Sequence, residues 1–124
     1  MNMLLNILVV AVAVEHTFIM ILEMFFIKSS TAKRAFGMDR KLLDIKEVRV
    51  MFANQGLYNG FLAAGLYWSL FAPTASEFQL KFFFISCVIV AAVYGTFTAN
   101  KKIILTQGSL AILAMLVLLI DAIA

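Results

Sequence analysis

The sequence predicts an all-α, polytopic membrane protein, an antiparallel bundle of four transmembrane helices. Hydrophobic residues make up 64% of the 124 residues, and only 14% are charged, against roughly 25% in an average soluble domain. A soluble domain of this length has too little interior to bury so much apolar surface. Four apolar stretches also reach the length of about 20 residues that a helix needs to cross the hydrocarbon core.

The four predicted spans cover residues 3–27, 51–72, 79–99 and 103–123. Each span must be helical, because lipid offers no partner for exposed backbone N–H and C=O groups. Pro73 ends the second span, and Thr74 or Ser76 is a candidate cap for the third. The connections at 73–78 and 100–102 are short, so the last three helices are expected to be antiparallel neighbours. We predict a single domain over residues 1–124.

The basic residues predict the orientation of the chain. Seven of the ten Lys and Arg residues lie in the long polar segment 28–50, and two more are Lys101 and Lys102. Only Lys81, at the head of the third span, lies on the other side. The positive-inside rule therefore places the loops 28–50 and 100–102 in the cytoplasm and both termini outside.

The first loop carries a helix-like pattern of its own. Asp39 can cap a helix start, and after it the charged residues alternate with the apolar residues Leu42, Leu43, Ile45 and Val48. This pattern predicts an interfacial helix leading into the second span, with basic side chains at the lipid headgroups. The alternative is a docking surface for a partner or for anionic lipid. Because the charges are mixed in sign, we expect no nucleic-acid partner.

Three titratable residues lie inside the first span, where charged groups are costly and need a partner or a purpose. They are Glu15, His16 and Glu23. His16 and Glu23 are seven residues apart and share one helical face, while Glu15 lies on an adjoining face. A histidine beside carboxylates suits proton transfer near neutral pH. These three are our candidate proton-handling residues. No catalytic residue is assigned, and whether the protein is an enzyme stays open.

Polar residues from all four spans fall at similar depth. Six of them lie four to eight residues from the cytoplasmic boundaries at 28, 50, 100 and 102, in a layer about 6 to 12 Å thick. His16 and Asn59 lie deeper. We predict a polar cavity that opens to the cytoplasm, with Glu15 and His16 at its floor. Its candidate ligand-binding residues are His16, Glu23, Asn54, Gln55, Tyr58, Asn59, Tyr94 and Gln107.

An alternative explanation treats these polar groups as contacts between helices. Intramembrane Asn, Gln and Tyr often form interhelical hydrogen bonds worth about 0.6 to 2 kcal/mol each. Gly56, Gly60 and Ala64 form a small-xxx-small strip that allows close helix approach, within the monomer or between copies. A single His and a single Cys give a weak metal signal, so we predict no metal site. The cofactor stays unknown.

Several of these residues carry a family resemblance. The stretch Asn54-Gln55-Gly56-Leu57-Tyr58-Asn59-Gly60-Phe61 is its most specific part, and the pairs Glu15-His16, Phe36-Gly37 and Tyr94-Gly95 and the segments 22–24 and 87–91 also contribute. Together they resemble the DUF1304 family. The resemblance implies a small bacterial integral membrane protein with four predicted spans, located in the inner membrane. It implies no activity, because the family's function is unknown.

Two classes of function remain. In the first, the protein binds a small polar or amphipathic ligand from the cytoplasmic side or relays protons, as a proton-linked transporter or a membrane enzyme. In the second, it is a structural or accessory subunit of a larger membrane complex. The expected partners are the lipid bilayer and either further copies of the chain or a larger complex.

Overall fold

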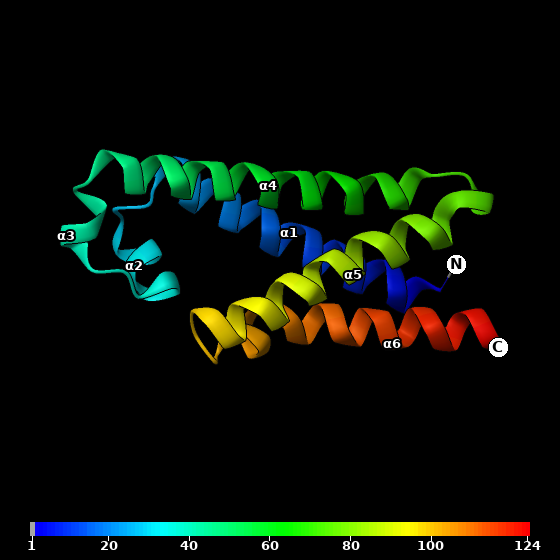
Figure 1. The fold of residues 1–124 in the computed structure, drawn as a ribbon. Coiled ribbons are helices and arrows are strands. Elements are labelled where there is room, and N and C mark those ends of the chain that lie inside the picture. The colour runs from blue at the N-terminus through cyan, green and yellow to red at the C-terminus, as the bar shows by residue number, and fades with distance from the viewer. Residues whose placement is uncertain (1) are drawn as a thin grey trace. The chain divides into compact units, whose positions relative to one another are not determined.

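A computed structural model describes residues 2–124 of the chain. These residues form helices and no strands (Figure 1), which confirms the all-α prediction. The elements are α1 (Met3–Phe25), α2 (Ser30–Phe36), α3 (Arg40–Leu43), α4 (Lys46–Phe71), α5 (Thr74–Thr98), the π-helix η1 (Ile104–Gly108) and α6 (Ser109–Ile123).

Among the described residues, three helical segments are long and apolar enough to cross a membrane. They are Met3–Phe25, Thr74–Thr98 and Ile104–Ile123. The last of these segments consists of η1 followed directly by α6. The second predicted span falls in α4, which is 26 residues long. The hydropathy of α4 is lower than that of these three segments, because α4 contains the charged residues Lys46 and Arg49 and the amide residues Asn54, Gln55 and Asn59. A fourth span therefore stays a prediction.

The chain divides into two compact units. Unit 1 combines the chain up to Glu15 with Leu62–Ala124, and unit 2 is His16–Phe61. Unit 1 therefore holds α5, η1 and α6 together with the start of α1 and the end of α4. Unit 2 holds the end of α1, the helices α2 and α3, and the start of α4.

The hydrophobic core of unit 1 gathers apolar residues from four helices. α5 and α6 run antiparallel (Figure 1), as the short 100–102 connection predicts, and α5 packs against both η1 and α6. Gly108 lets η1 approach α5, because a Cβ there would lie 3.3 Å from the Cβ of Ala92. The buried residues of α6 recur three and four positions apart, as in a helix with one core-facing stripe. The core includes Leu5, Val9, Val12, Leu66, Ile85, Val88, Ala111, Ala114 and Leu118.

In unit 2, α1 and α4 approach closely at two glycines. A Cβ on Gly56 would lie 2.8 Å from Met24 Cγ, and a Cβ on Gly60 would lie 2.5 Å from Met20 Sδ. The predicted small-residue strip is therefore confirmed at these two positions, and its contact lies inside the chain. Ala64 is exposed.

The segment 28–50 contains two capped helices. At α2, the backbone N–H of Ala32 donates to Ser29 Oγ at 3.1 Å. Gly37 ends α2 in the left-handed conformation, with φ of 66°, which glycine adopts without steric cost. Asp39 caps α3 by accepting a hydrogen bond from the backbone N–H of Lys41 at 3.0 Å, so the predicted cap is confirmed.

Two local predictions are wrong. The helix expected after Asp39 is in two pieces, because α3 ends at Leu43 and α4 begins at Lys46. Neither Thr74 nor Ser76 caps α5. That helix begins directly after Pro73 without a side-chain cap, and Ser76 Oγ donates to the carbonyl oxygen of Pro73 at 3.1 Å instead.

Candidate functional site

Unit 2 brings together two of the predicted site residues. Glu23 lies in the last turns of α1 and is only 4% exposed. Asn59, on α4, donates from Nδ2 to Glu23 Oε1 at 2.7 Å. The same amide group donates to the backbone carbonyl oxygen of Gln55 at 3.2 Å, which fixes the Asn59 side chain on its own helix. A buried carboxyl group is thus held across the α1–α4 contact.

An open groove of about 790 Å³ lies beside this pair, and we call it the Glu23 groove. Its lining combines the Glu23 carboxyl group with three cationic side chains, a hydroxyl group and an apolar wall. The lining residues are Glu23, Met24, Phe25, Phe26, Ile27, Lys28, Ser29, Lys46, Arg49, Val50 and Ala53. All of them belong to unit 2. The groove has the size of a typical small-molecule site, roughly 300 to 1,000 Å³.

The three cations of the groove differ in how firmly they are held. Arg49 is partly buried, and its Nη1 donates to the carbonyl oxygen of Leu43 at 2.8 Å. Lys28 forms an exposed ion pair with Asp44 at 3.1 Å, and such pairs contribute little to stability. Lys46 is exposed at the start of α4. Arg49 is therefore oriented by the fold, while the two lysines can reorient toward a ligand.

The other predicted residues of unit 2 lie apart from the groove lining. His16 is buried on α1, two turns before Glu23 and on the same face. Asn54 and Gln55 are exposed on α4. Tyr58 is 64% exposed, and its ring packs nearly perpendicular to that of Phe61, with centroids 5.9 Å apart.

Three predicted residues belong to unit 1. Glu15 carries a buried oxygen, Oε2, without a hydrogen-bond partner among residues 2–124. Tyr94 is 70% exposed on α5, where it lines a shallow apolar groove with Cys87. Gln107 is half-buried in η1. That these residues share one cavity with Glu23 stays a prediction.

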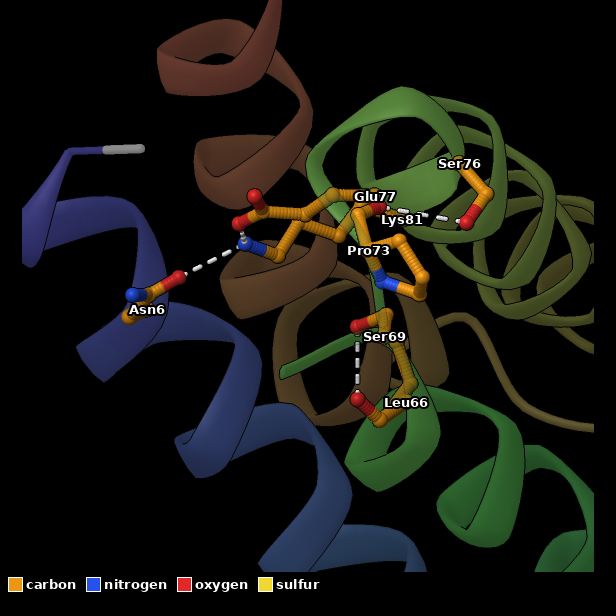
Figure 2. A network of polar contacts seen from close by, with 7 residues as sticks. All are labelled: Asn6, Leu66, Ser69, Pro73, Ser76, Glu77 and Lys81. Atoms are coloured by element: carbon orange, nitrogen blue, oxygen red, sulfur yellow. Dashed lines mark hydrogen bonds and ion pairs between the residues drawn. The ribbon is translucent and has the colours of Figure 1, made fainter. Parts of the chain in front are cut away.

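Sequence reasoning missed a polar network in unit 1. Lys81 is fully buried on α5, and its Nζ forms an ion pair with Glu77 one turn earlier. Nζ also donates to Asn6 Oδ1 on α1 at 2.6 Å, and Figure 2 shows the three side chains converging from the two helices. The Glu77–Lys81 spacing of four residues was the sequence signal that could have revealed the ion pair. Nearby on α4, Ser69 Oγ donates to the carbonyl oxygen of Leu66 at 2.6 Å.

The Glu23 groove offers hydrogen bonding, positive charge and apolar surface in one place. A buried carboxyl group at its edge can exchange a proton with water or with a ligand that enters. Among residues 2–124, no three His, Cys, Asp or Glu side chains are grouped as metal ligands would be. The groups that line the groove can bind a ligand and exchange protons with it.

Comparison with known proteins places the chain in a family. Residues 10–119 match the family described as "Protein of unknown function (DUF1304)". The chain is also 42% identical over 116 residues to the "Uncharacterized protein YpaA" of Lactococcus lactis subsp. lactis (strain IL1403), covering 94% of this chain and 97% of that protein. No solved structure matches. The resemblance drawn from the sequence is thereby confirmed, and the chain belongs to the DUF1304 family.

Proposed function

We propose that this protein binds a small amphipathic ligand from the cytoplasmic side of the bacterial inner membrane, in the Glu23 groove. Glu23 exchanges a proton with the bound ligand or with water beside it. The observation that carries the proposal is the position of Glu23, which is buried and held by Asn59 while it also lines an open groove. A proton-linked transporter and a membrane enzyme would both use such a site.

The proposal includes a topology of four spans in a single transmembrane domain. α4 is 26 residues long, which corresponds to about 39 Å at 1.5 Å per residue and exceeds the hydrocarbon thickness. Its Asn59 is already paired with Glu23, and this pairing lowers the cost of placing α4 in lipid. With the basic segment 28–50 in the cytoplasm, both termini lie outside and the groove lies at the cytoplasmic boundary.

A purely structural role for Glu23 is the competing explanation. A carboxyl group that served only to bind α1 to α4 would be replaceable by an amide, which costs less to bury. It would also be expected to lie closed off by packing. Glu23 instead borders a groove that three cations share. This arrangement favours a ligand site over a contact between helices.

The test uses three chain-matched amphiphiles, decanesulfonate, decanol and decyltrimethylammonium, added to protein in a neutral detergent and followed by native mass spectrometry. We expect at least one amphiphile to bind. Ala53→Trp fills the groove and should abolish this binding. Ala64→Trp, at an exposed position of α4, should not. Binding of none of the three, or equal loss in both variants, would overturn the proposal. Recovery of the protein in fixed stoichiometry with larger proteins, without amphiphile binding, would support the accessory role.

Proton exchange at Glu23 is tested with the amphiphile that binds. Its affinity should change with pH in the wild type and stay constant in Glu23→Gln, which keeps the Asn59 hydrogen bond. His16→Gln, a buried position two turns earlier on the same face of α1, serves as the control and should leave the pH dependence in place. An unchanged pH dependence in Glu23→Gln would contradict the proposal that Glu23 exchanges a proton.

A further inference from the structure

The charge on the lining of the Glu23 groove is unbalanced. Three cations line it, Lys28, Lys46 and Arg49, against the single carboxyl group of Glu23. The difference is two positive charges when Glu23 is ionised. Asp44 partly offsets Lys28 through an exposed ion pair, but it is not part of the lining. The groove therefore favours an anion, and one that carries more than a single charge.

The hydrogen-bond donors of the groove suit a phosphate group. Arg49 uses Nη1 on the Leu43 carbonyl oxygen, and the remaining N–H groups of its planar guanidinium can meet two oxygens of one phosphate. Ser29 Oγ accepts a hydrogen bond from the backbone of Ala32, which leaves its own O–H to donate. Lys46 adds an exposed, flexible ammonium group. A phosphate monoester carries about 1.5 to 2 negative charges near neutral pH, which matches the excess of positive charge.

The apolar wall of the groove suits a hydrocarbon chain. Phe25 and Phe26 line it and are 68% and 55% exposed. Phe25 is the last residue of α1, Phe26 follows it, and the cationic residue Lys28 comes two residues later. Aromatic and aliphatic surface next to cations is the pattern that binds an amphiphile with its head fixed and its chain directed into lipid.

We propose that the Glu23 groove binds a membrane lipid whose head group is a phosphate monoester, with the phosphate between Arg49, Lys46 and Ser29 and the chain against Phe25 and Phe26. This inference rests on the proposed function and names its ligand class. The lipid is drawn from the cytoplasmic leaflet, whose surface the groove faces in the proposed topology. The phosphate supplies the charge that the groove lacks, and the chain covers the exposed rings.

The test compares four probes by native mass spectrometry and by titration in neutral detergent. These are decyl phosphate, decylphosphocholine, decanesulfonate and inorganic phosphate. We expect decyl phosphate to bind about tenfold or more tightly than decylphosphocholine and decanesulfonate. Inorganic phosphate should bind far more weakly than decyl phosphate, because it lacks the chain. If inorganic phosphate bound as tightly as decyl phosphate, the ligand would be free phosphate and not a lipid, and the inference would be overturned.

Substitutions of the cationic residues test where the phosphate group binds in the Glu23 groove. Lys46→Gln should weaken decyl phosphate binding about tenfold, and the matched control Lys33→Gln, an exposed lysine of α2 outside the groove, should leave it unchanged. Arg49→Lys keeps the charge and removes the planar donor pair, so it should weaken decyl phosphate binding. Equal effects of Lys46→Gln and Lys33→Gln, or equal affinity for all three decyl probes, would overturn the inference. Binding that is lost in Ala53→Trp but shows no preference for phosphate would leave the proposed function standing.

Discussion

Replacing Lys81 by methionine tests how much the buried network of unit 1 contributes to stability. In the wild type, Lys81 Nζ contacts Glu77 and Asn6. Lys81→Met removes the cation and leaves the Glu77 carboxyl group, 13% exposed, without its partner. Breaking one side of a buried ion pair typically costs about 3 to 5 kcal/mol, because the remaining charge stays buried.

The exposed ion pair of unit 2 provides an internal reference. The side chains of Lys28 and Asp44 are 44% and 66% exposed, and a pair of this kind contributes about 0 to 1 kcal/mol. Asp44→Asn should therefore cost much less than Lys81→Met. The double variant Lys81→Met with Glu77→Leu removes both buried charges and should recover most of the loss. The coupling free energy between positions 77 and 81 should therefore be nearly as large as the cost of Lys81→Met alone.

The assay is unfolding in a neutral detergent, followed by circular dichroism. At roughly 4 °C per kcal/mol for a chain of this size, Lys81→Met should lower Tm by about 12 to 20 °C and Asp44→Asn by at most about 4 °C. Equal losses in these two variants would show that burial does not set the energy of the pair. A double variant as unstable as Lys81→Met would show that the loss comes from packing and not from charge.

Three further substitutions have predicted effects on stability, measured by the same unfolding assay. Gly56→Val should cost about 1 to 3 kcal/mol by overpacking, because its Cβ would meet Met24 at 2.8 Å; Ala64→Val, at an exposed position, should be nearly neutral. Gly37→Ala should cost about 1 kcal/mol, because φ is 66° there. Ser29→Ala should also cost about 1 kcal/mol by removing the cap of α2. A neutral Gly56→Val would refute the close α1–α4 contact.

Apolarity predicted where the long helices lie but not where α4 and α5 begin. The first and last spans closely match α1 and the segment Ile104–Ile123. α4 begins at Lys46 rather than at 51, and α5 at Thr74 rather than at 79, because polar first turns are helical without being apolar. The break between α3 and α4 was missed, because the apolar pattern of residues 42–48 continues across it.

Residue type and depth along the helices predicted part of the candidate site. Glu23 and Asn59 were named from the cost of burying polar groups, and they form a hydrogen bond. Asn54, Gln55 and Tyr58 share the depth of Glu23 but are exposed, because depth does not fix the rotation of a helix. The cations of the groove were assigned to the orientation of the chain, to the lipid headgroups or to a docking surface, and not to the site of Glu23. Their position beside Glu23 depends on the path of the chain after α1.

The π-helix η1 gives this region a tolerance to changes in chain length. A π-turn holds one residue more than an α-turn over the same arc. Deleting a single residue within Ile104–Gly108 would restore ordinary α-helix and leave the stripe of Ala111, Ala114 and Leu118 in register with the core. The same deletion inside α6 would rotate everything beyond it by about 100° and turn that stripe away. Insertions and deletions among relatives should therefore concentrate in η1.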